Sequence, residues 1–350
     1  MLLIIGGCTF DSLGEGNIPI EGSSTITPDT GLDQSDWFEV YFTDPDSPQA
    51  STLRGGPDAA LAEGIHQAKL SVEVAMDSLD LWSLRNALLA AHRRGVAVRV
   101  VVESDQLAST EVQDLIENGI PVMDDRNAGL MHNKFTIIDR LQVWTGSMNY
   151  TVSGAYHSDN NLIRIRSVEL AQDYLLEFEE MFLDHQFGSK SPANTPLPVV
   201  NVDGTQVEVY FSPDDGTIEH VIALVQNAQD EILFMAFSFT DDDLALAMKE
   251  AVYSGVEVAG VMDKSQALGN IGGEYEYLLE NGIAVRLDGN PYSMHHKALV
   301  IDDQIVITGS YNFSNSAKTR NDENTLVIHS QVIAALYKEE FERVWMTAQE

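Results

Sequence analysis

Residues 131–149 read MHNKFTIIDRLQVWTGSMN, and residues 294–312 read MHHKALVIDDQIVITGSYN. Both stretches follow one pattern: a histidine, any residue, a lysine, four residues, an aspartate, six residues, and then Gly-Ser-x-Asn. A pattern of this length that occurs twice in the same register indicates an internal duplication. The two copies therefore decide how the whole chain is organised.

The similarity extends outward from the two motifs in the same order along the chain. Ala68 corresponds to Ala228 and His132 to His295, so the offset grows from 160 to 163 residues through one small insertion. Further matching segments are 37–42 with 206–211, 94–98 with 254–258, and 116–120 with 279–283. Each half, at about 150 residues, is long enough to bury a core of its own.

The chain divides into four segments on this basis. Residues 37–188 form the first repeat and residues 206–350 the second. Residues 189–205 between them are rich in Pro, Ser and Asn and are predicted to be a linker. Residues 1–36 have a short apolar start and are then rich in Gly, Ser, Thr, Pro and Asp, which is typical of a flexible tether.

Strand and helix patterns alternate within each repeat. In the second, residues 231–239 form a continuous apolar run, as expected of a strand buried on both faces. Residues 244–253 have helical periodicity, and 256–262 form the next strand. Such units predict an α/β fold, in which each repeat is a mostly parallel mixed sheet flanked by helices and a pseudo-twofold axis relates the repeats. The acidic triplet 241–243 is interpreted as a helix N-cap rather than a metal site.

The composition is that of a folded and strongly acidic protein. The 350 residues include 54 Asp and Glu but only 20 Lys and Arg, a formal net charge of −34, and 44% are hydrophobic. Aromatic residues throughout the chain exclude a wholly disordered protein, and no apolar stretch approaches the roughly 20 residues of a membrane-spanning helix. A surface this acidic disfavours a broad nucleic-acid-binding face, although a few lysines can dominate one pocket.

The only cysteine, Cys8, follows a short apolar run. The sequence Ile5-Gly6-Gly7-Cys8 resembles the lipobox of bacterial lipoproteins, in which the cysteine is lipidated. This resemblance implies an extracytoplasmic, lipid-anchored protein, although no basic residue precedes Cys8 and the apolar run is shorter than that of a usual signal peptide. The alternative is an N-terminus with one isolated cysteine and a cytoplasmic protein.

The spacing within each motif places its polar residues on one face. In an extended strand, residues i and i+2 project to the same side, so His132 points with Lys134 and Ser147 with Asn149. Asp139 has the opposite parity and is interpreted as a structural turn residue. The second copy has the same arrangement at His295, Lys297, Ser310, Asn312 and Asp302. Around a pseudo-twofold axis, the halves would form one pocket with paired histidines, lysines, serines and asparagines.

Written as paired His-x-Lys-x4-Asp motifs, the sequence resembles the phospholipase D superfamily over both halves, from about residue 37 to residue 350. The resemblance implies a phosphodiesterase in which one histidine attacks phosphorus to form a phosphohistidine, while the other protonates the leaving alkoxide and then activates water. The lysines and the Ser and Asn donors would neutralise the non-bridging oxygens. No cofactor or metal is implied, because lysines supply the positive charge. A monomer is expected, since both motifs lie in one chain.

One position distinguishes the two copies. In the superfamily, the residue 28 positions after the motif histidine is often a carboxylate that hydrogen-bonds this histidine; here it is Glu323 for His295 but Asn160 for His132. A carboxylate partner favours the charged imidazolium. The sequence therefore predicts that Glu323 orients His295 as the general acid and that Asn160 backs His132 as the nucleophile.

Three functions are consistent with these motifs. The acidic surface and the lipobox resemblance favour a phospholipase D-type hydrolase, which would take a phospholipid at a membrane surface and release phosphatidic acid and a head-group alcohol. The alternative is an extracellular endonuclease, because the second motif resembles those of small bacterial endonucleases and of cardiolipin hydrolases. The second alternative, an inactive scaffold that binds phosphorylated ligands, is disfavoured because His, Lys, Ser and Asn are intact in both copies.

Overall fold

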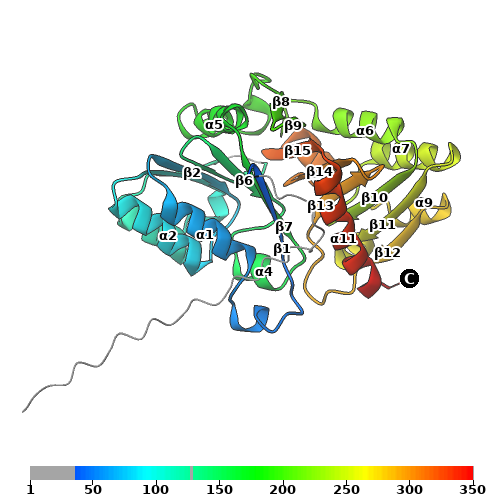
Figure 1. Cartoon of the computed structure of the whole chain (residues 1–350), viewed down its shortest axis with the longest axis horizontal. Helices are drawn as coiled ribbons and strands as arrows, with labels where there is room; N and C mark the ends of the chain where they lie inside the picture. Colours follow the sequence, from blue (N-terminus) through cyan, green and yellow to red (C-terminus); the bar gives the residue numbers. More distant parts are fainter. Residues whose placement is uncertain (1–35, 127–128, 350) are drawn as a thin grey trace, which may run out of the picture.

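The computed structural model describes residues 36–126 and 129–349. These residues form two α/β halves that lie side by side, each built around its own sheet (Figure 1). This arrangement confirms the predicted fold of two similar repeats. Cys8 lies outside the described residues, so its lipidation stays a prediction.

The first half is a seven-stranded mixed sheet in the order β1-β7-β6-β5-β2-β3-β4. Strands β2, β3 and β4 run parallel, and the other neighbouring pairs are antiparallel. The strands are β1 (Phe38–Phe42), β2 (Ser71–Met76), β3 (Ala97–Val102), β4 (Val122–Asp124), β5 (Lys134–Ile138), β6 (Gln142–Gly146) and β7 (Asn161–Arg166). The helices are α1 (Pro57–Gln67), α2 (Trp82–Arg93) and α3 (Thr110–Glu117) on one face, α5 (Val168–Phe182) on the other, and the short α4 (Val152–Tyr156).

The second half repeats this plan with eight strands in the order β12-β11-β10-β13-β14-β15-β9-β8. The strands are β8 (Val199–Val202), β9 (Thr205–Ser212), β10 (Glu231–Ala236), β11 (Glu257–Met262), β12 (Ala284–Leu287), β13 (Lys297–Ile301), β14 (Ile305–Gly309) and β15 (Glu323–His329). The helices are α6 (Thr217–Asn227), α7 (Asp242–Tyr253), α8 (Lys264–Gly269), α9 (Tyr275–Glu280), α10 (Asn315–Thr319) and α11 (Gln331–Thr347). No helix in the described ranges is both long and apolar enough to cross a membrane.

Strand β8 lies inside the segment that the sequence analysis assigned to a linker. Residues 199–202 pair antiparallel with β9 at the edge of the second sheet. The hairpin turn is Asp203-Gly204, in which both residues have positive φ angles, 51° and 85°. An Asp-Gly turn of this kind matches the twist of two antiparallel strands. The linker therefore ends before Val199, and the Asp-Gly pair was the signal for the hairpin.

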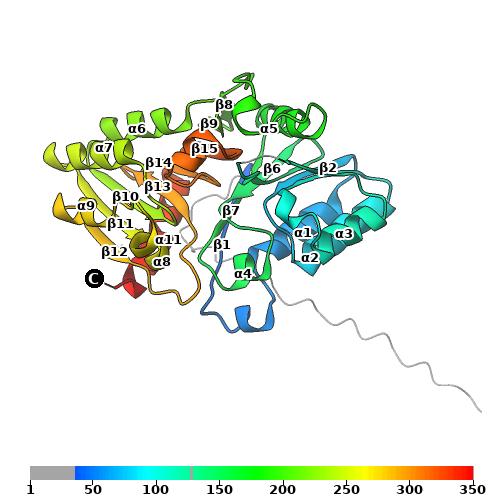
Figure 2. The ribbon, with the colours of Figure 1, turned by 180° about the vertical axis from the view of Figure 1, so that it is seen from behind.

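The two halves share one hydrophobic core. Helix α5 contributes Tyr174 and Phe178 to it, and α11 contributes Tyr337 and Phe341, together with strand residues of both sheets. Two further cores, one in each half, lie under the helices on the outer faces of the sheets. Figure 2 shows the same two-part arrangement from behind. This shared core fixes the two motifs relative to each other.

Candidate active site

The two motifs meet because each half crosses over to the other just before its histidine. The backbone of Met131 forms a parallel bridge with Asp322, and Met294 forms the matching bridge with Asp159. The N–H of His132 donates to the carbonyl of Asp322 at 3.0 Å, and that of His295 to the carbonyl of Asp159 at 2.8 Å. These paired bridges place each histidine beside the strand start of the opposite half.

The crossing exchanges the partners that the sequence spacing predicted for the histidines. His132 Nδ1 donates to Glu323 Oε2 at 2.7 Å, whereas His295 Nδ1 donates to Asn160 Oδ1 at 2.9 Å and lies 3.1 Å from the carbonyl of Ser147. The predicted pairs, Glu323 with His295 and Asn160 with His132, are therefore wrong. The reason is geometric: Glu323 follows Asp322, which is bridged to the first motif, and Asn160 follows Asp159, which is bridged to the second.

The two motif lysines are almost completely buried. Lys134 is 1% and Lys297 2% exposed, and each Nζ donates to the carbonyl of the motif histidine two residues earlier, at 2.6 and 2.7 Å. Burial lowers the pKa of Lys134. The pKa of Lys297 falls well below its usual value because of burial and the neighbouring charge of Lys134. Burial, and for Lys297 also the charge of Lys134, disfavours the charged form of these ammonium groups, and a bound anion would favour it.

His295 is affected by the same positive charges. Its pKa lies well below the usual value because of burial and the proximity of Lys297, Lys134 and His132. An anionic group between the lysines would offset this repulsion and favour the protonated ring. The site can therefore couple the binding of an anion to the loading of a proton on His295.

The motif serines lie behind the histidines rather than between them. Ser147 Oγ donates to Asn160 Oδ1 at 2.9 Å and accepts the N–H of Asn161, while Ser310 Oγ accepts the N–H of Asn324 at 3.0 Å. Both serines are fully buried. Through these bonds the serines hold the starts of β7 and β15, where the histidine partners Asn160 and Glu323 lie. Donation from the serines to a phosphate stays a prediction.

The motif asparagines are half-buried. The Oδ1 atoms of Asn149 and Asn312 are buried and have no hydrogen-bond partner among the described residues. Polar atoms of this kind are rarely left unsatisfied without a functional reason. These two oxygens accept hydrogen bonds and cannot donate one to a phosphate, so the predicted donation from the asparagines to a phosphate stays a prediction.

The motif aspartates lie at turns away from the histidines. Asp139 accepts the backbone N–H groups of residues 69–71, and Asp302 those of residues 229–231. Both aspartates have positive φ angles, 55° and 53°. Burial would raise the pKa of Asp302, but its three backbone donors outweigh burial and lower it. Their place in the structure is that of turn residues, which clamp each motif to the start of a neighbouring strand.

Sequence reasoning missed two residues beside the motifs, Asp77 after β2 and Phe237 after β10. The ring of Phe237 lies 4.6 Å from that of His295, and Lys297 Nζ lies 4.7 Å from its centre. Asp77 interacts electrostatically with Lys134, His132 and Lys297. The signal available in the sequence was their common position, each immediately after the strand that pairs with its motif strand.

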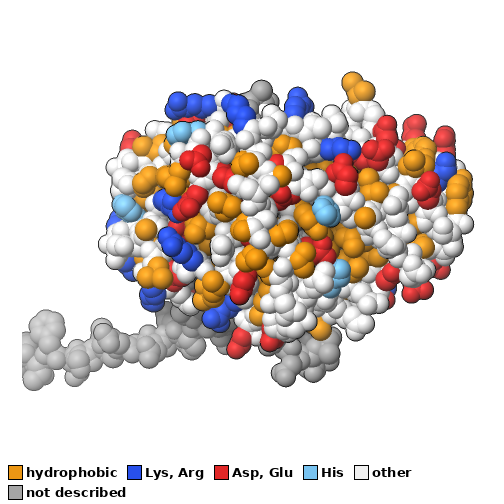
Figure 3. Space-filling model, turned by 90° about the horizontal axis from the view of Figure 1, so that it is seen from above, with side chains coloured by type: hydrophobic (Ala, Val, Ile, Leu, Met, Phe, Trp, Pro, Cys, Tyr) orange, Lys and Arg blue, Asp and Glu red, His pale blue; other side chains and the backbone are white. Residues whose placement is uncertain are grey.

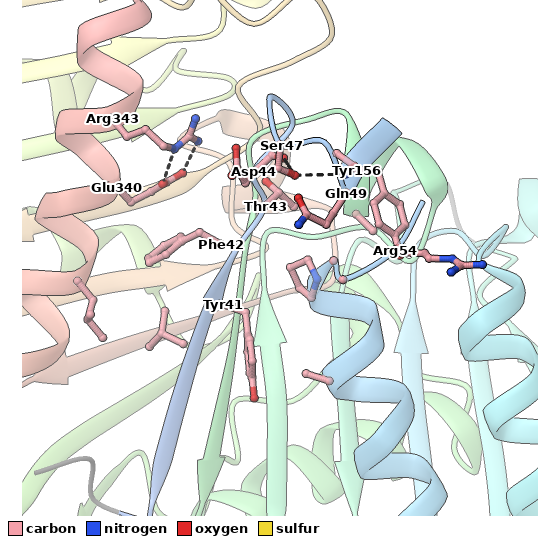
Figure 4. Close-up of a pocket in the computed structure, with 18 of the residues that line it drawn as sticks. Tyr41, Phe42, Thr43, Asp44, Ser47, Gln49, Arg54, Tyr156, Glu340 and Arg343 are labelled. Carbon is pink, nitrogen blue, oxygen red and sulfur yellow. Dashed lines mark hydrogen bonds and ion pairs between the residues drawn. The ribbon is translucent and has the colours of Figure 1, made fainter. Parts of the chain in front are cut away.

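Other features of the described residues lie outside this site. In residues 36–126 and 129–349, no three His, Cys, Asp or Glu side chains are grouped as metal ligands would be. A cavity of about 270 Å³ lies between β1, the start of α1 and α11, and its lining includes Phe42, Tyr156 and Arg343 (Figure 4). Neither motif histidine lines this cavity.

The fold and the site define a duplicated α/β protein whose halves each bring one histidine and one lysine to a shared centre. A family model described as "Cardiolipin synthase, PLD-like domain" matches the chain twice, over residues 61–182 and 221–345. The chain therefore belongs to the phospholipase D superfamily. Each match contains one of the two motifs, in agreement with the duplication.

Known proteins with sequences similar to this chain include a cardiolipin hydrolase and a phospholipase D. The mitochondrial cardiolipin hydrolase of Xenopus laevis is 32% identical over 120 residues, which cover 34% of this chain and 57% of that protein. The phospholipase D of Rickettsia prowazekii (strain Madrid E) is 32% identical over 133 residues, covering 38% and 64%. The chain thus spans less than two thirds of the length of either relative.

A solved structure shares the fold over most of both chains. The phosphatidylserine synthase of Haemophilus influenzae Rd KW20 superposes with a TM-score of 0.65 and 15% sequence identity, and the match covers 83% of this chain and 84% of that one. At this identity the likeness shows a common fold with two halves.

Proposed function

We propose that the protein is a phosphodiesterase that works through a phosphohistidine intermediate and needs no metal. The crossed arrangement of two histidines around two buried lysines supports this proposal most directly. The lysines would neutralise the non-bridging oxygens as charge develops on the phosphoryl group. The histidines would act on opposite sides of phosphorus, one as nucleophile and one as acid.

The observed partners favour His132 as the nucleophile. Its Nδ1–H faces Glu323, so Nε2 carries the free lone pair, and attack on phosphorus forms an N–P bond and expels the alkoxide. The resulting phosphohistidine ring keeps its Nδ1–H and carries a positive charge, which the Glu323 carboxylate stabilises. The prediction for His132 is retained, but its physical basis differs from the one that the sequence suggested.

His295 fits the role of acid and then base. Its Nδ1–H faces only neutral acceptors, so Nε2 holds its proton weakly and transfers it readily to the leaving alkoxide. The neutral ring can then remove a proton from water, which attacks phosphorus and releases His132. His295 thus gives one proton to the leaving group in the first step and regains one from water in the second.

Phospholipids are the substrate class that we infer. The similar proteins named phospholipase D and cardiolipin hydrolase support it, as does the formal charge of −34. On the face seen in Figure 3, Lys and Arg lie scattered, mainly over the first half, and form no continuous basic band. Nucleic-acid backbones are usually bound by such bands. The expected products are phosphatidic acid and a head-group alcohol.

The test is turnover by the full chain on phosphatidylcholine vesicles in the presence of EDTA, with single-stranded DNA in a parallel assay. We expect choline release that is lost in His132→Asn and retained in the control His185→Asn, which alters an exposed histidine outside the site. Loss of choline release in EDTA would contradict a metal-independent reaction. Cleavage of DNA alone would make the protein a nuclease, and phosphate binding without turnover of either substrate would make it a scaffold.

A further inference from the structure

The two halves present different side chains at one equivalent position of the site. The N–H of Asp77 donates to the carbonyl of Asn133 at 3.1 Å, and the N–H of Phe237 donates to the carbonyl of His296 at 2.9 Å. Asn133 and His296 are the middle residues of the two His-x-Lys motifs. Asp77 and Phe237 are therefore held against the motifs by the same backbone contact. At this position the first half has a carboxylate and the second half has a phenyl ring.

Phe237 forms an apolar wall on the His295 side. Its ring meets the His295 ring edge-on at 4.6 Å, and Lys297 Nζ lies over it at 4.7 Å. A ring in this place removes water from the histidine that protonates the leaving group and strengthens nearby electrostatic interactions. It also offers a contact for an uncharged arm of the substrate.

Asp77 gives the His132 side a negative charge. Burial would raise the pKa of this half-buried carboxyl, but Lys134, His132, a hydrogen bond from Ser78 and Lys297 outweigh burial and lower it, so Asp77 is ionised at neutral pH. Glu323 and Glu103 also act on Lys134, and Glu323 and Asp263 on Lys297, so Asp77 is one of several carboxylates near the motif lysines. One phosphodiester adds a single negative charge to these surroundings.

We propose that Asp77 and Phe237 determine specificity, selecting a diester that carries a single phosphate and rejecting one with a second phosphate beside the reacting group. The inference rests on the proposed phosphodiesterase activity and narrows its substrate class. A second phosphate near Asp77 is repelled by its carboxylate, whereas a phospholipid with one phosphate and uncharged ester arms is not. Polynucleotides, and lipids with two neighbouring phosphates, are therefore poor substrates.

The experiment compares two soluble substrates with the same leaving group. They are the p-nitrophenyl ester of thymidine 5′-phosphate and the same compound with an added 3′-phosphate. The measured quantity is the ratio of kcat/KM for the doubly phosphorylated compound to that for the singly phosphorylated one. The protein is the full chain, as wild type, Asp77→Asn and the control Glu117→Gln, which removes one charge from an exposed position in the same half.

Removal of the Asp77 charge should raise this ratio by roughly 3- to 10-fold at low salt, as expected for one charge pair near a protein surface. The gain should shrink at about 0.5 M salt, because the interaction is partly screened, and Glu117→Gln should leave the ratio unchanged. If Asp77 only positions Lys134, Asp77→Asn lowers both kcat/KM values in proportion, and an unchanged ratio overturns the inference.

Phe237→Asp provides an independent variant. It gives the second half the carboxylate of the first, so the ratio should fall below that of the wild type by about threefold. A ratio that rises or stays constant in this variant also overturns the inference. If the wild type hydrolyses neither compound, the proposed function itself fails, which is distinguishable from turnover with an unchanged ratio.

Discussion

Behind the active site, the second half is cross-linked by charges that the first half lacks. His296 Nε2 contacts Glu340 of α11 at 2.8 Å, and Arg343 bonds both Glu340 and Asp159 (Figure 4 shows the contact of Arg343 with Glu340). Burial would raise the pKa of Glu340, but Arg343 and His296 outweigh burial and lower it. Basic and acidic groups thus alternate in the order His296, Glu340, Arg343 and Asp159.

The equivalent positions around the first motif are Asn133, Glu177 and Glu180, each 163 residues earlier, and Asp322, which is 163 residues after Asp159. A glutamate stands where the second half has Arg343, and an asparagine where it has His296. Buried oxygens of Glu177, Glu180 and Asp322 have no hydrogen-bond partner among the described residues. Burial and the neighbouring carboxylates raise the pKa of all three groups. Carboxyl groups with raised pKa values therefore lie around the first motif, where ion pairs lie around the second.

The layer directly under the histidines is the same in both halves. Asn324 is bonded by Thr145, Tyr174 and Asn133, and Asn161 by Thr308, Tyr337 and His296. The two halves thus share this hydrogen-bond pattern around Asn324 and Asn161. They differ in the group bonded to each histidine, which is Glu323 for His132 and Asn160 for His295, and in the charges behind it.

The largest effect should come from the crossed partners. Glu323→Gln removes the charge behind His132 and should lower kcat by about 10²-fold or more, because a neutral partner no longer stabilises the cationic phosphohistidine. Asn160→Asp gives His295 a carboxylate partner as well, and this carboxylate should raise the pKa of the His295 ring. The pH–rate profile of Asn160→Asp should therefore shift to higher pH. An equal loss in both variants with no shift in pH would contradict the crossed assignment.

Arg343→Met should break the charge network of the second half. It leaves Glu340 and Asp159 buried without their cation, and the side chain of Arg343 is 33% exposed, so we expect the free energy of unfolding to fall by about 2–3 kcal/mol. Urea denaturation measures the change. Arg54→Met is the control, because Arg54 is exposed and lines the same cavity. A loss of equal size in both variants would refute a specific role for the network.

A smaller and pH-dependent effect is expected from Glu180→Arg, which gives the first half the cation of the second. Burial and nearby carboxylates raise the pKa of Asp214 to about 7, and burial and Asp215 raise that of Asp173 to about 6. Raised values mean that the folded state binds these protons more tightly than the unfolded state. The stability that they contribute is therefore present at low pH and lost as the pH rises through 6 to 7.

Glu180→Arg should offset that loss. We expect it to raise the free energy of unfolding by about 1 kcal/mol at pH 8 and by much less at pH 5, where the carboxyls are protonated. Glu117→Arg makes the same change of charge on the surface of the first half and is the control. A gain that does not depend on pH, or one matched by the control, would show that the acidic cluster is not the cause.

The sequence was sufficient for the repeat, the α/β fold and the residues of the motifs, because periodicity and spacing report the faces of a strand. It could not reveal the crossed partners, since the distance along the chain from His295 to Glu323 says nothing of which half lies beneath each ring. Asp77 was missed for a related reason. It joins the site only through the pairing of β2 with β5, which is a contact between distant segments.

The most direct test of the central claim, that His132 forms a covalent bond to phosphorus and His295 assists departure and hydrolysis, uses His295→Asn with bis(p-nitrophenyl) phosphate. Because p-nitrophenolate leaves without protonation, this variant should release one equivalent per site in a burst and then stall. Mass spectrometry of the quenched protein should find the p-nitrophenyl phosphoryl group on the peptide that contains His132. Absence of an adduct together with steady turnover, or an adduct elsewhere in the chain, would contradict the account.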